Sequence, residues 1–460
     1  MLIRLAIQNF LSFYEEREFQ MIAGNYKRHK HHVYQLDEGF EVLRAAAIYG
    51  ANGAGKSNIV KAVAWLKQLV TEGTANRDNE IAVFPFGLKP ESANEPSSVE
   101  LEFKVDDQVY AYFLAADASS TIVEEWLYDI PKAGEEELIF LRKTTPDGDT
   151  SIDVGERFSA TDKDKFRYEL YAHELRPNQP FLNEANDKLL EWSGPPYDWF
   201  KNCLEVVFPD GRYLRHVKRF LEDATFRKHI DTIVTKVDTG LRKLGVQRTE
   251  ITGIERFGAE FLDAISEASS PGKGAYFAPI VKDDSFSEVL AVEGEKAIIG
   301  SFIGEHYTED LTAPARFTMD KESDGTRRLV EIAPAFVDSI YEGKVYLIDE
   351  IGRSMHPVML KALVRYYLGI DKQHSKGQLI FTTHESHLLD LDMFRQDEIW
   401  FVEKDKRGQS DLYSLSEYKP RHDKDIKKGY LSGRYGAIPF VADLASLDWD
   451  SHEEKPELQA

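Results

Sequence analysis

Residues Gly50 to Ser57 read Gly-Ala-Asn-Gly-Ala-Gly-Lys-Ser and match the phosphate-loop pattern G-x-x-x-x-G-K-S. The apolar run Val42–Tyr49 before them is short, which predicts a buried strand. The apolar spacing from Ile59 to Val70 after them predicts an amphipathic helix. Strand, glycine loop and helix follow in the order that a phosphate-binding loop requires, so a chance glycine turn that only caps a helix is the weaker interpretation.

Each part of this loop has a task in binding phosphate. Glycines let the backbone curl until successive N–H groups point at phosphate oxygens, and the start of the helix adds its dipole. Lys56 would bring catalytic positive charge to the β- and γ-phosphates, and the hydroxyl of Ser57 would be a ligand of Mg²⁺. We therefore expect ATP and Mg²⁺ as cofactors. The expected nucleotide-binding residues of the loop are Gly50, Ala51, Asn52, Gly53, Ala54, Gly55, Lys56, Ser57 and Asn58.

Two later apolar runs end in polar residues. The run from Val345 ends in Asp349 and Glu350, and the run Gln378–Thr383 ends in His384. Parallel strands deliver such residues to the crevice where open α/β sheets bind ligands. Asp349 suits the Mg²⁺ shell, Glu350 would orient and deprotonate the attacking water, and His384 would sense the γ-phosphate. The alternatives are a solvated acidic turn and a histidine satisfied at a strand end.

A fourth segment, Ser323-Asp-Gly-Thr326, precedes a helix predicted from Leu329 to about Ile340. Ser323 would cap that helix, and Gly325 would permit a tight turn. Taken alone, this capping role is the stronger interpretation. A nucleotide-binding role for Ser323 and Gly325 is favoured only by the resemblance that follows.

Together with the first strand, these segments resemble ABC-type ATPases of the RecF–SMC–OLD branch, and most closely the stand-alone OLD-like ATPases of bacterial anti-phage systems. The resemblance implies an ABC-type P-loop ATPase head. It also implies a head-to-tail, ATP-sandwiched dimer or larger homo-oligomer, in which Ser323 of one copy reaches the γ-phosphate held by Lys56 of the other. The matching segments are Gln8–Phe13 on the first strand, Gly50–Ser57 as Walker A, Leu347–Glu350 as Walker B, Ser323–Thr326 as the signature, Ser354–Pro357 as the D-loop and His384 as the H-loop.

Some family features are absent. Asp324 stands where the signature often has a glycine, and Gly352 stands where OLD-type proteins commonly have an acidic residue. About 75 residues follow His384, too few for the TOPRIM nuclease domain of OLD proteins. Sustained heptads typical of a coiled coil are also missing. We therefore expect a separate toxin or nuclease effector, TOPRIM-type enzymes included, and a phage trigger protein, as in the AriA-like ATPases of PARIS systems and, less closely, the PtuA-like ATPases of Septu systems.

Composition limits the other function classes. The chain has 57 Lys and Arg against 79 Asp and Glu, a net charge of −22, which disfavours DNA binding over a broad face and leaves nucleic acid an open partner. A RecF- or SMC-like DNA-repair clamp and a nucleotide-dependent scaffold that does not hydrolyse remain the alternatives. Cys203 is the single cysteine, so an intrachain disulfide is excluded. The sequence lacks a long apolar run, so we expect a cytoplasmic protein with no membrane partner.

The expected fold class is α/β: a mixed sheet with flanking helices, an antiparallel β subdomain and a mainly helical insertion. The expected order is a first ATPase lobe with the β subdomain at 1–158, the helical insertion at 159–245, a second lobe of alternating strands and helices at 246–440, and an acidic tail at 441–460. The basic segment Lys27–His32 contains three histidines. We expect a solvated loop there, or a partner or phosphate contact, because a metal site needs ligands on rigid elements.

Overall fold

The computed structural model describes residues 1–37, 40–74, 76, 80–131, 136–209, 216–237, 239–252, 287–293, 296–309, 313–370, 377–422 and 424–439. The described strands form sheets of seven, six, four and two strands. No helix within these ranges is long and apolar enough to cross a membrane. The predicted acidic tail at 441–460 lies outside the described residues.

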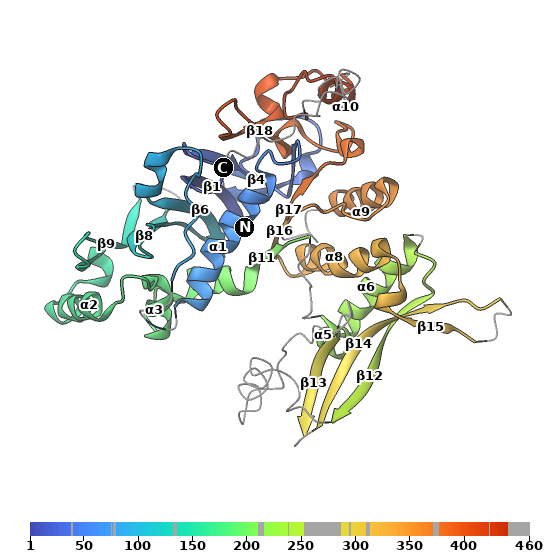
Figure 1. The fold of residues 1–460 in the computed structure, drawn as a ribbon, viewed down its shortest axis with the longest axis horizontal. Helices are drawn as coiled ribbons and strands as arrows, with labels where there is room; N and C mark the ends of the chain where they lie inside the picture. Colours follow the sequence, from blue (N-terminus) through green and yellow to red (C-terminus); the bar gives the residue numbers. More distant parts are fainter. Residues whose placement is uncertain are drawn as a thin grey trace, which may run out of the picture.

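The six-stranded sheet is the centre of the molecule (Figure 1). Its neighbouring strands are parallel except for the last pair, which is antiparallel. In spatial order the strands are β11 (Leu204–Val207), β16 (Val345–Ile348), β17 (Gln378–Thr383), β5 (Ala45–Gly50), β18 (Ile399–Lys404) and β19 (Ser410–Ser414). Three of them, β5, β16 and β17, carry the segments that the sequence assigned to nucleotide binding.

The inner strands β5 and β16 are buried on both faces, which explains their apolar sequences. On β5, Ala46 and Ile48 belong to one core, whereas Ala47 and Tyr49 belong to the other. The first core includes the apolar side of helix α1 (Lys56–Glu72). Helices α8 (Asp324–Tyr341) and α9 (Pro357–Gly369) cover the opposite face. Helix α8 includes the helix predicted from Leu329 to about Ile340.

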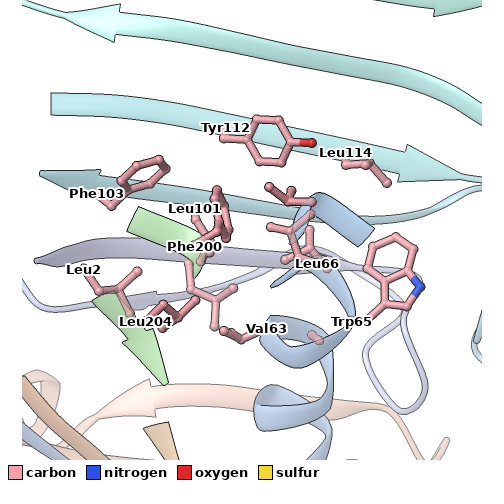
Figure 2. Close-up of a cluster of buried hydrophobic side chains, with 14 of the residues drawn as sticks. Leu2, Val63, Trp65, Leu66, Leu101, Phe103, Tyr112, Leu114, Phe200 and Leu204 are labelled. Atoms are coloured by element: carbon pink, nitrogen blue, oxygen red, sulfur yellow. The ribbon is translucent and has the colours of Figure 1, made fainter. Parts of the chain in front are cut away.

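A seven-stranded antiparallel sheet packs on the far side of α1. Figure 2 shows Val63 and Leu66 of α1 facing Leu101 and Tyr112 of this sheet. The hairpin predicted at Asp106–Gln108 is confirmed, since this turn joins the antiparallel strands Ser97–Val105 and Gln108–Ala116. In spatial order the strands are β10 (Thr150–Val154), β9 (Glu137–Thr144), β8 (Ile122–Ile130), β7 (Gln108–Ala116), β6 (Ser97–Val105), β1 (Leu2–Gln8) and β2 (Arg17–Gln20).

The segment between 159 and 245 is mostly helical, as expected, but it also contributes a strand. Strand β11 pairs in parallel with β16, so this segment completes the edge of the central sheet. A π-helical turn at Trp199–Cys203 leads into β11. The helices are α2 (Asp162–Glu174), α3 (Phe181–Asp187), α4 (Gly194–Asp198), α5 (Val217–Glu222) and α6 (Ala224–Lys236).

The alternation of strands and helices expected from Gly245 onward begins only at α8, so that expectation is wrong for the stretch before it. An antiparallel sheet lies there instead and extends away from the central sheet (Figure 1). Its strands are β12 (Lys243–Thr252), β13 (Ser287–Glu293), β14 (Lys296–His306) and β15 (Ala315–Thr318). The sequence gives little sign of it because period-two alternation is weak in these strands.

Arg44 divides the apolar run that the sequence presented as one strand. The run forms β4 (Phe40–Leu43), which pairs with β3 (Val33–Asp37), and then β5 in the central sheet. The Arg44 side chain is completely buried and donates hydrogen bonds to backbone carbonyls of three other residues, His31, Tyr367 and Ile370. One charged side chain therefore fixes the chain between two sheets.

Candidate functional site

The phosphate loop connects the end of β5 to the start of α1. Gly53 and Gly55 have φ angles of 76° and 119°, in the region that only glycine adopts without strain. A Cβ atom on Gly55 would lie 2.3 Å from Oγ of Ser410, and one on Gly50 would lie 2.4 Å from the carbonyl oxygen of Val402. Backbone conformation and close neighbours therefore both require the glycines of the motif.

The side chain of Lys56 folds back onto the phosphate loop. Its Nζ donates hydrogen bonds to the carbonyl oxygens of Gly50 and Ala51, at 3.0 and 3.1 Å. Burial lowers the pKa of Lys56 to about 8, while the charges of Glu350 and Asp349 act in the opposite direction. The two carboxylates lie far away in sequence, yet they are near enough to affect the lysine. The phosphate loop and the acidic strand end therefore share one site.

Thr382 on β17 organises that strand end. Its hydroxyl donates to Oδ1 of the buried Asp349 at 2.6 Å and accepts from the backbone N–H of Glu350 at 2.8 Å. The backbone N–H of Asp349 donates to the carbonyl of Val207 on β11. Neighbouring strands on both sides therefore hold the acidic pair. Sequence analysis gave Thr382 no role. Its place near the end of a second predicted parallel strand could have indicated that it lies beside Asp349.

Glu350 and His384 face each other across the strand ends. Glu350 Oε1 lies 3.8 Å from His384 Nε2, and both side chains are more than a third exposed, at 38% and 39%, so both are open to a ligand. Glu350 has a φ of 47°, which turns the chain sharply after β16. Partial burial, followed by the charge of Lys56, lowers the pKa of His384, so its ring is neutral at pH 7.

Arg328 connects helix α8 to the same turn, and sequence reasoning did not single it out. The side chain is buried and donates from Nη2 to the carbonyl oxygens of Asp349 and Glu350, at 3.2 and 3.3 Å. Its Nη1 donates to Glu331 at 3.1 Å. A cation on the buried side of an amphipathic helix was the available signal, because such a charge is rarely buried without partners.

Ser323 and Gly325 stand apart from these residues in their contacts. Ser323 is exposed and caps α8, since its Oγ accepts from the backbone N–H of Thr326 at 3.1 Å. A Cβ atom on Gly325 would lie 2.8 Å from the carbonyl oxygen of Ser354, where φ is 62°. The predicted signature and D-loop segments are thus neighbours. Contact of Ser323 and Gly325 with a nucleotide stays a prediction.

The loop is also fixed from its outer side. Asn58 donates to Oγ of Ser12 at 2.7 Å. The hydroxyl of Ser410 donates to the carbonyl of Ala54 at 2.5 Å, and its Oγ lies 2.6 Å from Oγ of Ser12. Asn58 therefore serves the shape of the loop in this structure. Ser12 lies in the segment Gln8–Phe13, whereas Ser410 on β19 could be found only from the fold.

The donor set fits a magnesium ion. Mg²⁺ prefers oxygen ligands and keeps several of its waters. The hydroxyl of Ser57, in the first turn of α1, and the carboxylate of Asp349, at the end of β16, are such ligands. These two residues would hold the ion, which would supply charge compensation for the phosphates.

The family described as "AAA domain, putative AbiEii toxin, Type IV TA system" matches residues 45–390. The chain belongs to this family. The matched stretch begins at β5 and includes the phosphate loop, the acidic strand end and His384. A search of curated proteins found no match.

Solved structures of SMC head domains are similar to the chain over most of its length. The SMC head domain from Thermotoga maritima shares 12% identity at a TM-score of 0.35, covering 90% of this chain and 98% of that one. An SmcHead bound to the C-winged helix domain of ScpA shares 16% identity at a TM-score of 0.36, covering 91% and 99%. An Smc head with an extended coiled coil, bound to the C-terminal domain of ScpA derived from Pyrococcus furiosus, shares 15% at 0.37, covering 94% and 99%.

These distant likenesses add no argument about the site. The predicted α/β fold class, with a mixed sheet, flanking helices and an antiparallel sheet subdomain, is confirmed by the structure. An ATPase-type domain of the AAA family is likewise established.

Proposed function

We propose that the chain is a Mg²⁺-dependent ATPase that works as a sensor or scaffold and controls a separate effector protein. The observation that carries the ATPase proposal is the convergence of residues from three separate strand ends. Lys56 is affected by the charges of Asp349 and Glu350, and Glu350 lies 3.8 Å from His384. A phosphate chain, a metal ion and an attacking water need these groups in one place.

In this proposal each side chain has one task. Lys56 and the N–H groups of the loop bind the phosphates, and Lys56 compensates the charge that develops in the transition state. Glu350 orients the attacking water and accepts its proton. His384, neutral at pH 7, hydrogen-bonds the γ-phosphate. Thr382 is a positioning residue, because it fixes both the carboxylate of Asp349 and the backbone of Glu350.

The proposal extends to a homo-oligomer in which two heads pack head to tail on ATP. Its support is the exposed position of Ser323 at the start of α8, where the hydroxyl and the helix N-terminus suit an anionic ligand from a second copy. Asp324, also in the first turn, would lie beside that phosphate and weaken the contact. ATP would then join the two copies, and hydrolysis would release them.

The effector role is the finer part of the proposal. Its support is the resemblance to OLD-like ATPases of anti-phage systems, together with the family description, which names a putative AbiEii toxin and a type IV toxin–antitoxin system. A toxin or nuclease encoded nearby would be the partner, and the net charge of −22 favours protein partners over a DNA clamp.

The test compares the wild-type chain with Glu350→Gln. We expect the variant to bind ATP with unchanged affinity, to release no phosphate and to accumulate as an ATP-bound dimer in light scattering. Lys61→Gln, an exposed change on α1, is the matched control and should behave as wild type. Phosphate release by Glu350→Gln at the wild-type rate would contradict the proposal, and tight binding without release by the wild type would favour the non-hydrolysing scaffold.

A further inference from the structure

Three histidines gather at one short turn before β3. His29 precedes the 3₁₀ turn Lys30–His32, and His31 and His32 lie within it. One ring nitrogen from each histidine can be chosen so that the three atoms lie within 4.8 Å of one another. The ring centroids of His31 and His32 are 4.4 Å apart, and those of His29 and His32 are 4.8 Å apart. Among the described residues, this is the cluster of three potential metal ligands that the nucleotide site does not account for.

Two of the rings are oriented through their second nitrogen. Nδ1 of His32 lies 3.0 Å from both carboxyl oxygens of Glu398, and both side chains are buried. Nε2 of His29 lies 3.0 Å from the carbonyl oxygen of Leu391. A histidine that binds a metal through one nitrogen characteristically hydrogen-bonds a carboxylate or carbonyl through the other. Nε2 of His32 and Nδ1 of His29 are therefore the atoms available to a metal.

The turn is held in place by the surrounding backbone, which a bare loop would not provide. Arg44 donates to it twice, from its backbone N–H to the carbonyl of His32 and from Nη1 to the carbonyl of His31, both at 2.9 Å. Glu398 is fixed in turn by the backbone N–H of Arg395 at 2.7 Å. The objection raised by the sequence, that the histidines lack a rigid support, therefore does not hold.

Two of the cations near the turn are paired with carboxylates. Arg28 is paired with Asp392, and Arg395 is paired with Asp397, each at 2.7 Å. The Glu398 carboxyl adjoins the Nδ1 side of the His32 ring.

We propose that His29, His31 and His32 bind one Zn²⁺ ion. Imidazole nitrogens suit zinc, with Zn–N bonds of about 2.0–2.1 Å, which place tetrahedral ligand atoms about 3.3 Å apart. Small rotations of His31, which is exposed, and of His29, which is half-buried, close the present spacing. The exposed side of His31 leaves the fourth position to water or to a residue of another protein.

The hydrogen bonds of the His29 and His32 rings connect two parts of the chain that are distant in sequence. The turn leads into β3, whereas Leu391 and Glu398 belong to the segment between β17 and β18 of the central sheet. Zinc would stabilise this junction, and the residues proposed to bind the nucleotide do not include it. The proposal is therefore independent of the ATPase proposal.

The experiment uses the full-length, untagged protein, stripped of metal and free of nucleotide. It is titrated with Co²⁺, whose visible absorption reports nitrogen ligands in a tetrahedral site, and then with Zn²⁺ as competitor. We expect one Co²⁺ per chain, displaced by Zn²⁺. His29→Ala and His31→Ala should each weaken binding at least tenfold, and Glu398→Gln should weaken it by about 10- to 100-fold. His173→Ala, an exposed histidine on α2, should change nothing.

Circular dichroism of each variant checks its fold, and His29 and His31 can be replaced without opening the core because neither is buried. Asp349→Asn should leave the Co²⁺ absorption intact, which separates this site from the magnesium site. Absence of tetrahedral absorption in the wild-type protein would overturn the proposal. Equal Co²⁺ affinity in wild type, His29→Ala and His31→Ala would overturn it as well.

Discussion

The site around Lys56 and the turn around His32 are both polar clusters held by buried contacts, yet they differ in how the sequence encodes them. The phosphate loop lies within eight consecutive residues, and its glycines, lysine and serine have fixed spacing. The histidine turn depends on Glu398, which is 366 residues away from His32 in the sequence. A local motif can be read before folding, whereas a cluster supported by distant residues becomes visible only in the structure.

The two clusters also differ in how they shift the pKa of the side chain at their centre. Lys56 keeps a pKa of about 8, because Asp349 and Glu350 offset its burial. His32 has a pKa of about 3, because burial and the nearby Arg44 and Arg395 disfavour its charge. The first cluster is thus arranged to hold a cationic side chain against anionic phosphate, and the second to keep an imidazole neutral.

The largest expected effect separates the two clusters. Lys56→Ala removes the cation that faces the phosphates, so we expect ATP binding to fall by at least 100-fold and hydrolysis to become undetectable. Fluorescence titration with an ATP analogue and a phosphate-release assay measure the two quantities. Zn²⁺ affinity should be unchanged, and loss of both activities in this variant would show that the clusters are not independent.

A smaller effect is expected at the residue that the sequence reading missed. Thr382→Val leaves Oδ1 of Asp349 and the N–H of Glu350 without their partner, a loss of about 1–3 kcal/mol for each buried group. We expect the hydrolysis rate to fall about 10- to 100-fold, with a smaller change in ATP affinity. Thr382→Ser keeps the hydroxyl and should restore most of the rate, whereas an equally slow Thr382→Ser would assign the effect to packing.

The smallest expected effect is on the pH profile. Because the pKa of His384 lies below its ordinary 6.5, the ring stays neutral as the pH falls through 6.5 and gains its proton only at lower pH. The hydrolysis rate should therefore hold at pH 6.5 and decline below it, by several-fold at pH 5. His384→Gln should be slower but should lose this acidic limb. If the rate of the His384→Gln variant falls at acidic pH as the wild-type rate does, the fall must come from the titration of another group.

The sequence predicted three strands of the central sheet, β5, β16 and β17, because buried parallel strands are short apolar runs. It did not predict β18 and β19. The apolar runs from Val345 and at Gln378–Thr383 form β16 and β17. Strand β11 and the sheet β12–β15 were missed, since a four-residue edge strand and antiparallel strands of mixed polarity give little local signal. Arg44 explains a further miss, because only its distant carbonyl partners end β4 and begin β5.

The sequence placed the site residues that follow predicted strands, but not those that act through contacts with other elements. Lys56, Asp349, Glu350 and His384 end or follow strands, and parallel topology brings such ends together. Arg328, Thr382 and Ser410 act through contacts with residues of other elements, so their identity alone carried no functional meaning. The contacts of Ser323 with a nucleotide involve a second copy and stay a prediction.

The most direct test of the central claim is the rate of phosphate release by Glu350→Gln under conditions in which ATP binding is verified on the same sample. The convergence of Lys56, Asp349, Glu350 and His384 predicts a variant that binds Mg²⁺ and ATP normally and releases phosphate at least 100 times more slowly than the wild type. Wild-type release by this variant would contradict the account, because the chemistry would then not take place where these strand ends meet.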